Sequence, residues 1–306
     1  MILFMYLSTI ARASSDLKVF VTIKPYHSLV SGVMEGVGKP VLIIDGNNSP
    51  HSYTLLPSIA KRLQEANIIF WGGQILEGFL SKSIKSLAKS AKLISLVEIN
   101  DLTQHNFRSS KLLKKNNFLD DNDYNDINKK NKKTEIDPHI WLNPINAKKI
   151  INKIVQILIN EDPLNEEIYI RNGKNYKLRL DDLDKFLGEK LKEVINKPFF
   201  VFHDAYQYLE KRYNLKIIGS FILNSSYGMS VRRLQMIKEI IKNEKIICVF
   251  SEPKISQKLL ITVVKGTSTK IGILDPIGID LDNGSDMYFK LMDNLIISLR
   301  KCILNE

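Results

Sequence analysis

Three of the five histidines stand at positions where a metal ligand would be expected. His51 follows the sequence NSP, His139 lies within DPHIWLNP, and His203 directly follows the apolar sequence FFVF. Asp275 comes directly after another apolar run. Neutral imidazoles and carboxylates are ligands that Zn²⁺ binds in proteins. We expect these four side chains to close on one divalent metal ion between two lobes.

The ligand types favour zinc over manganese. Three imidazoles and one carboxylate suit four-coordinate Zn²⁺, whereas Mn²⁺ prefers more oxygen ligands. Because a ligating imidazole must lose its proton, we expect the affinity to fall below about pH 6. Taken singly, each histidine is better explained as a packed or hydrogen-bonded residue, and only the set of three favours a metal site. His27, early in a predicted helix, and His105, in a polar insert, are expected not to be ligands, although His105 could contact metal transiently.

Other polar and aromatic residues near these positions have two readings each. Glu252, which also follows an apolar run, is either an acceptor for a ligand histidine or a surface carboxylate. Asp204 is expected to cap the following helix rather than to bind metal. Trp71 and Trp141 are expected in the core or the wall of the cleft, and Tyr53 either lines the cleft or packs in the core.

The first half of the chain alternates apolar β-type runs with amphipathic helical patterns. Each predicted strand is apolar on both faces, which is typical of a buried parallel sheet. The order βαβαβαβ therefore predicts a parallel sheet with helices on both faces. The predicted strands are Lys18–Ile23, Pro40–Ile44, Ile68–Trp71 and Leu93–Leu96.

The second half repeats this pattern, so the expected fold class is α/β with two lobes. The predicted strands are Phe199–Phe202, Lys216–Ser220, Lys245–Phe250 and Lys270–Leu274, followed by a closing helix at Ser285–Ile303. In open α/β sheets, ligands bind beyond the carboxyl ends of the strands. His203 and Asp275 stand at such ends in the second lobe, and His51 and His139 belong to the first.

The expected domain organisation has four parts. Residues 1–13 have an apolar run and an Ala-Arg-Ala sequence, which indicates a signal peptide; the alternative is a frayed apolar tail. Residues 16–160 form the N-terminal lobe, with a flexible polar loop at 101–135 that has few apolar residues. Residues 161–197 form one long linking helix, about 45 Å if thirty residues are helical. Residues 198–306 form the C-terminal lobe. A rigid helical link predicts small motions between the lobes.

Charge and cysteine content limit the possible partners. The 306-residue chain has a net charge of +11, but its lysines are scattered and no basic stripe alternates with aromatic residues. This argues against nucleic-acid binding. Cys248 and Cys302 are the only cysteines. They would be two thiols in a cytosolic protein and a disulfide in an exported one.

The ordered set of motifs resembles the substrate-binding components of bacterial ABC importers for zinc or manganese, specifically the zinc-uptake proteins of the ZnuA type. The motifs are SPHSY with LPS, DPHIWLNP, FHDAY and LDP, and the resemblance runs from about Lys18 to the C-terminus. It implies two α/β lobes, a backbone helix and a metal in the cleft. By position, His51, His139 and His203 match ligands, and manganese-type members generally have a carboxylate in place of His203.

The resemblance is less uniform at three other places. Asp275 matches a ligand in some members, whereas in others a water or another acid completes the site. Cys248 and Cys302 look like the C-terminal disulfide of some zinc-type members. The polar loop 101–135 stands where many zinc-type members have a loop rich in His and acidic residues, but here it holds mainly Lys, Asn and Asp. A solvated loop is therefore expected, without a role in zinc capture.

The expected function is that of a periplasmic, soluble, monomeric receptor that is not an enzyme. It would bind Zn²⁺ and deliver the ion to the membrane permease of a zinc ABC importer. One alternative is a manganese receptor of the same family. Another is a zinc hydrolase with Glu252 as the base, but the chain has no HExxH sequence. A surface adhesin with the same fold is a third alternative. A cysteine near the start would have hinted at a lipid anchor for such a protein, but the sequence has none there.

Overall fold

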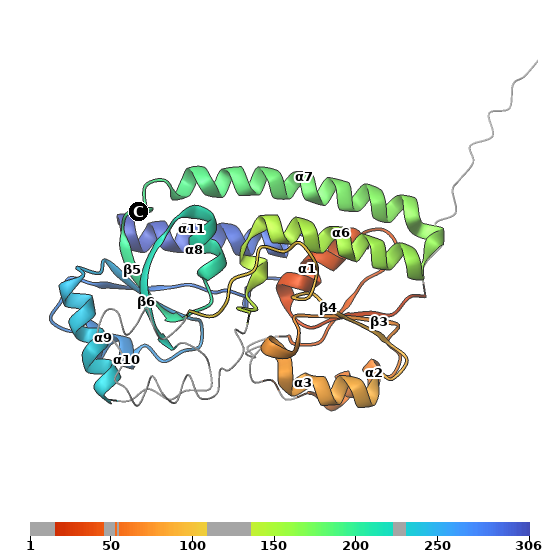
Figure 1. Cartoon of the computed structure of the whole chain (residues 1–306), viewed down its shortest axis with the longest axis horizontal. Helices are drawn as coiled ribbons and strands as arrows, with labels where there is room; N and C mark the ends of the chain where they lie inside the picture. The colour runs from red at the N-terminus through yellow and green to blue at the C-terminus, as the bar shows by residue number, and fades with distance from the viewer. Residues whose placement is uncertain (1–15, 46–52, 54, 109–135, 223–230) are drawn as a thin grey trace, which may run out of the picture.

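The computed structural model describes residues 16–45, 53, 55–108, 136–222 and 231–306. Two α/β lobes stand side by side beneath the long helix α7, which passes over both (Figure 1). The predicted fold class is confirmed. The predicted signal peptide, His51 and most of the polar loop lie outside the described residues.

The N-terminal lobe is built on a four-stranded parallel sheet in the order β2-β1-β3-β4. Strands β1 and β3 are apolar on both faces and completely buried, as parallel strands covered by helices must be. The strands are β1 (Val19–Val21), β2 (Val41–Leu42), β3 (Ile68–Trp71) and β4 (Lys92–Ser95). The helices are α1 (Lys24–Val33), α2 (Pro57–Leu63) and α3 (Gln74–Leu87), with α1 above the sheet and α2 and α3 below it in Figure 1.

The C-terminal lobe repeats this topology with the parallel order β6-β5-β7-β8. In both lobes the chain first adds a strand on one side of the first strand and then continues on the other side. The switch points therefore lie between β1 and β3 and between β5 and β7. The strands are β5 (Pro198–His203), β6 (Lys216–Ile222), β7 (Cys248–Ser251) and β8 (Lys270–Ile273). The helices are α8 (Gln207–Tyr213), α9 (Val231–Asn243), α10 (Lys258–Val264) and α11 (Met287–Leu304).

Two helices in sequence connect the lobes. A short 3₁₀ turn, η1 (Ile140–Leu142), precedes α6 (Pro144–Glu161), and a second one, η2 (Pro163–Asn165), precedes α7 (Glu166–Leu191). The linking helix was expected over residues 161–197, but α7 begins at Glu166 and has 26 residues. Asp162 accounts for the difference, because its side chain accepts hydrogen bonds from Asn165 and from Tyr169 and closes a turn.

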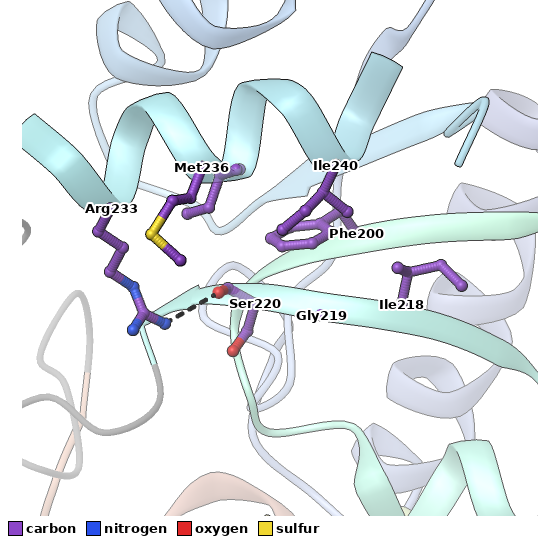
Figure 2. Close-up of a pocket in the computed structure, with 8 residues that line it drawn as sticks. Phe200, Ile218, Gly219, Ser220, Arg233, Met236 and Ile240 are labelled. Atoms are coloured by element: carbon purple, nitrogen blue, oxygen red, sulfur yellow. Dashed lines mark hydrogen bonds between the residues drawn. The ribbon is translucent and has the colours of Figure 1, made fainter. Parts of the chain in front are cut away.

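One continuous hydrophobic core runs through both lobes and the buried face of α7. A smaller cluster lies under α9 and α10. Beside α9 is a cavity of ≈ 20 Å³, lined mainly by apolar side chains, where Arg233 donates to the backbone oxygen of Ser220 (Figure 2). Arg233 also donates to the backbone oxygen of Phe221. Such a volume holds about one water molecule and is too small for a larger ligand. Among the described helices, none combines the length and the apolar character needed to cross a bilayer.

Candidate metal site between the lobes

His139 is fixed by the turn that begins the connection between the lobes. Pro144 occupies the first turn of α6, and the side chain of Asn143 accepts a hydrogen bond from the backbone N–H of Ile145 at 2.9 Å. Just before this cap, Oδ1 of Asp137 lies 2.7 Å from Nδ1 of His139 and accepts its backbone N–H at 3.0 Å. Both side chains are buried. The local turn therefore sets the orientation of the imidazole.

The C-terminal lobe holds Asp137 in place. Gln207 donates to Oδ2 of Asp137 at 3.0 Å, and the hydroxyl of Tyr208 donates to its backbone oxygen at 2.8 Å. Burial raises the pKa of Asp137, but the charge of His139 and hydrogen bonds from His139 and Gln207 outweigh it and bring the pKa below the ordinary value. Asp137 is therefore an ionised acceptor for the Nδ1 proton of His139.

His203 lies at the carboxyl end of β5, at the switch point of its lobe. Glu252 follows the neighbouring strand β7, and its Oε1 lies 3.3 Å from Nδ1 of His203. Of the two readings of Glu252, the structure supports the acceptor for a histidine. Burial lowers the pKa of His203, but the hydrogen bond to Glu252 and its negative charge outweigh burial, so the pKa lies above 6.5.

The two imidazole rings lie together, with centroids 4.9 Å apart and an angle of 74° between their planes. In each ring Nδ1 faces a carboxylate. A carboxylate only accepts, so the neutral imidazole carries its proton on Nδ1 and its lone pair on Nε2. A carboxylate behind a histidine is the usual arrangement at metal sites, because it fixes the tautomer and makes the ligand more basic. The pair His139–His203 is thus prepared for a cation.

Asp275 begins the loop between β8 and α11. Its Oδ1 accepts the backbone N–H groups of Ile277 and Gly278 at 3.0 and 2.9 Å, and its Oδ2 accepts that of Ile279 at 2.6 Å. Burial raises the pKa of Asp275 despite these bonds. Within the residues described, no three His, Cys, Asp or Glu side chains are grouped closely enough to hold a metal ion. The structure thus joins two of the predicted ligands, orders the Asp275 loop and does not describe His51.

Two other histidines have separate environments. Nε2 of His27 lies 3.1 Å from the backbone oxygen of Pro40 within the N-terminal lobe. The ring of His105 lies 4.9 Å from that of Tyr208. Neither residue contributes to a described metal-binding group.

Asp204 does not have the predicted capping role. Helix α8 begins only at Gln207, its N-cap residue is Tyr206, and no side chain caps it. Asp204 instead pairs with Arg108, whose Nε lies 3.0 Å from Oδ1. Arg108 also pairs with Glu210. The prediction was wrong because the choice of partner depends on a residue almost a hundred positions earlier in the chain.

The aromatic residues considered above are buried in the core. Trp141 is fully buried, and its indole lies 5.3 Å from His139 and 5.5 Å from Tyr26. Trp71 and Tyr53 are also buried, and Tyr53 meets Phe79 edge to face. Trp141 thus packs directly against the site histidine His139, and Trp71 and Tyr53 are packed in the core.

Sequence reasoning missed Asp137 and Gln207. Asp137 stands two residues before His139, a spacing that places a carboxylate within reach of the imidazole in a turn, so its role had a local signal. Gln207 had none, because its contact with Asp137 joins residues 70 positions apart.

Comparison with known proteins gives the family. Residues 19–302 match the family model described as "Zinc-uptake complex component A periplasmic". The chain belongs to the ZnuA family. The high-affinity zinc uptake system protein ZnuA of Brucella abortus (strain 2308) is 38% identical over 304 residues, which cover 93% of this chain and 91% of the relative. ZnuA of Yersinia pestis is 30% identical, with 93% and 91% covered.

Solved structures agree with the ZnuA fold. A crystal structure of ZnuA superposes with a TM-score of 0.75 at 22% identity, covering 93% of this chain and all of the other. The substrate-binding protein FpvC of Pseudomonas aeruginosa, in complex with Mn²⁺, gives 0.78 at 19% identity, covering 95% and 99%. At this identity the superpositions establish the fold alone. The family match places the chain among the substrate-binding components of transport systems, which are binding proteins rather than enzymes.

The expected disulfide is present. Cys248, at the start of β7, is bonded to Cys302 in α11, and their Cα atoms are 6.2 Å apart. It lies wholly within the C-terminal lobe. Cys248 is at the amino end of its strand, whereas Glu252 follows the carboxyl end, so the crosslink stabilises the lobe at the edge away from the candidate site.

Proposed function

We propose that this protein captures Zn²⁺ between its lobes with His51, His139, His203 and Asp275, and delivers the ion to the permease of a zinc ABC importer. The ion is the cargo, and no bond in a substrate is made or broken. The protein would be exported with residues 1–13 as its signal peptide and act as a monomer in the periplasm.

The observation that carries the proposal is the pair of imidazoles supported by carboxylates. His139 lies in the connection that leaves the N-terminal lobe and His203 ends strand β5 of the C-terminal lobe, yet their rings are 4.9 Å apart. Each Nδ1 faces a buried or partly buried carboxylate, Asp137 or Glu252. Two histidines oriented in this way suit zinc better than manganese, whose sites are richer in oxygen ligands.

Two further ligands complete the proposed set. Asp275 follows β8, at the same edge of the sheet as His203, and its loop is ordered by three hydrogen bonds from the backbone. His51 is proposed from its sequence motif and its match to the family pattern. Four ligands of these types fit tetrahedral Zn²⁺.

The test is zinc affinity after removal of a proposed ligand. The protein is stripped with a chelator, and Zn²⁺ binding is measured by competition with a chromophoric chelator. We expect His203→Ala to lower the affinity at least about tenfold, since the loss of even a supporting partner typically costs this much. His27→Ala, which removes a histidine bonded elsewhere, serves as the control.

Two outcomes would contradict the proposal. Equal zinc affinity of His203→Ala and the parent would refute the ligand assignment. Displacement of Zn²⁺ by an equal concentration of Mn²⁺ would favour the manganese alternative. Co-purification with the permease expressed in the same membrane, in the presence of zinc, tests the delivery step.

A further inference from the structure

The loop that carries Asp275 belongs to the C-terminal lobe but is attached to the other lobe. This loop, residues 274–286, connects β8 to α11 and is called here the Asp275 loop. Tyr206 of its own lobe donates to the backbone oxygen of Leu274 at 3.0 Å. Trp141, from the connection that leaves the N-terminal lobe, donates through its indole N–H to the oxygen of Pro276 at 2.8 Å. The beginning of the loop is therefore fixed from two directions.

Lys24, the first residue of α1, is the third attachment. Its Nζ donates to the backbone oxygen of Ile279 at 2.7 Å and to that of Leu281 at 2.8 Å. Nζ also lies 3.8 Å from the carboxylate of Asp45, which follows β2. An ammonium group has three donors, and here it meets two carbonyl oxygens and a carboxylate.

The burial of Lys24 makes this arrangement specific. Its side chain is 8% exposed, whereas that of Asp45 is 60% exposed. A buried ammonium is tolerated only when hydrogen bonds replace its hydration. The two carbonyls supply these bonds, so they are the principal partners, and the exposed Asp45 adds a weaker, screened interaction. The carbonyls come from residues 255 and 257 positions later in the chain.

The topology explains why Lys24 can reach the site. It follows β1, the strand that corresponds to β5 of the other lobe, and so lies beside the switch point of the N-terminal sheet, as His203 does in its own lobe. The same helix supplies Ser28, which donates to the oxygen of Ser285 at 3.0 Å. Helix α1 thus holds the loop near its middle and at its end.

The hydrogen bonds of Lys24 and those of Asp275 meet at Ile279. Ile279 donates its N–H to the Asp275 carboxylate and accepts from Lys24 through its C=O. The turn between them includes Gly278 at φ 71°, where an added Cβ would lie 2.3 Å from Cε of Met287. Glycine leaves the backbone free, so the conformation of this turn depends on its attachments.

From this continuity we infer that Lys24 is a positioning residue, which fastens the Asp275 loop to the N-terminal lobe and so places the Asp275 carboxylate for the cation. This inference rests on the proposed function, since it takes Asp275 as a ligand. Lys24 acts through the loop and does not bind the metal, because its ammonium has no lone pair to donate.

The test combines three variants of the full chain: Lys24→Met, Asp275→Asn and the double variant. Lys24→Met keeps the apolar stem and removes the donors and the charge. We expect it to weaken Zn²⁺ binding by roughly 10- to 100-fold. If Lys24 acts through Asp275, the double variant binds no more than about twofold more weakly than Asp275→Asn. Lys39→Met, which removes an exposed lysine just after α1, is the matched control.

A spectroscopic readout separates positioning from a general loss of stability. Co²⁺ replaces Zn²⁺ as the probe, and its visible absorption reports the number and type of ligands. We expect the Co²⁺ spectrum of Lys24→Met to shift from that of the parent to that of Asp275→Asn. Hydrogen exchange on the metal-free proteins should show faster exchange at residues 277–281 in Lys24→Met and not in Lys39→Met.

The outcomes that overturn the inference are distinct from those that overturn the proposed function. If Asp275→Asn weakens binding but Lys24→Met matches Lys39→Met, or if the two effects multiply in the double variant, Lys24 has no positioning role. If Asp275→Asn binds like the parent, the ligand set is wrong and the inference falls with it.

Should Lys24→Met fail to fold, Lys24→Arg replaces it, because it keeps the charge while displacing the donors. An Arg variant with the parent's affinity and Co²⁺ spectrum would also overturn the inference.

Discussion

At the scale of single residues, the candidate site depends on two carboxylate–imidazole pairs with different origins. Asp137 and His139 are neighbours in sequence, so one turn builds their pair. His203 and Glu252 are brought together only because β5 and β7 are adjacent in the sheet. The first pair depends on local geometry and the second on the tertiary fold. Changes to the sheet should therefore affect His203 more than His139.

Glu252 should control the pH dependence of zinc binding. Glu252 raises the pKa of His203 above 6.5. As the pH falls, protons therefore begin to compete with the metal for His203 while the pH is still above 6.5. We expect Glu252→Gln to move this competition to lower pH and to weaken binding about tenfold at pH 8, where His203 has lost its basic support. Zinc affinity measured between pH 5.5 and 8.5 checks both effects. In a His203→Ala background, Glu252→Gln should change nothing further, and a full additional effect there would refute this coupling.

Glu77 is a buried carboxyl group near the switch point of the other lobe. Its side chain is inaccessible to solvent, and its Oε2 accepts the N–H of Gly72 at 2.8 Å. Burial raises its pKa from 4.5 to about 8. A carboxyl group with a raised pKa stabilises the fold below its unfolded pKa, and this contribution is lost as the pH rises through about 8.

Replacing Glu77 should therefore flatten the pH dependence of stability. The amide of Glu77→Gln retains an acceptor for Gly72 and has no proton to lose. Between pH 5 and pH 8, we expect the free energy of unfolding of the parent to fall by a few kcal/mol more than that of Glu77→Gln. The expected size is on the order of 1.4 kcal/mol per pKa unit. Urea unfolding at both pH values measures the difference. Parallel stability curves for the two proteins would show that Glu77 ionises normally in the fold.

At the scale of elements, the sequence predicted the strands well because they are buried on both faces. Strand β3 matches its prediction residue for residue, since Ile68–Trp71 is flanked by polar residues and by two glycines. The start of α7 was displaced because Asp162 forms a turn with Tyr169, which periodicity does not reveal. Patterns in the sequence report burial, whereas ends of helices depend on individual polar partners.

The same contrast between local pattern and distant partner explains which residues of the site the sequence could identify. The sequence identified His139 and His203 as a pair, because each stands at an expected loop position, and the structure brings their rings together. It did not identify Lys24 or Gln207, and it gave Asp204 the wrong partner. All three act across the chain, on Ile279, Asp137 and Arg108 respectively. Nothing in the local sequence distinguishes a lysine at the start of a helix from one that crosses between lobes.

Two glycines of α7 allow a matched test of how closely this helix packs. An added Cβ at Gly173 would lie 2.5 Å from Cγ2 of Val155 in α6, whereas one at Gly188 meets nothing within 4 Å. Gly188→Ala should raise the free energy of unfolding by up to about 1 kcal/mol through helix propensity. Gly173→Ala should lower it, because overpacking costs about 1–3 kcal/mol and a β-branched neighbour cannot easily move.

Urea unfolding of the two variants measures both effects. The double variant Gly173→Ala, Val155→Ala is the control for the clash. Compared with Val155→Ala alone, it shows the cost of the methyl group at position 173 when Val155 is absent. We expect this cost to be smaller than in the parent, because the space left by Val155 accommodates the methyl group. Equal stabilisation by both alanines would mean that α6 and α7 do not pack closely at Gly173.

At the scale of the whole molecule, the lobes are joined by more than one helix. A single hydrophobic core extends through both lobes, and α7 packs on α1, α6 and α11. Lys24, Trp141 and Ser28 add hydrogen bonds from the N-terminal half to the Asp275 loop. This arrangement supports the expectation that the lobes move little relative to one another, so zinc exchange should depend on loops rather than on wide opening of the lobes.

The disulfide should stabilise the whole molecule without affecting zinc binding. It closes a loop over a sequence separation of 54 residues, for which the chain-entropy model gives about 4 kcal/mol. We expect the variant Cys248→Ala, Cys302→Ala to lose stability of this order in urea unfolding, and the reduced parent to behave in the same way. Because Cys248 lies at the end of β7 opposite Glu252, zinc affinity of the folded variant should remain within about twofold of the parent. A folded variant with strongly weakened zinc binding would instead show that the crosslink at the far edge of the sheet fixes the position of Glu252 behind His203.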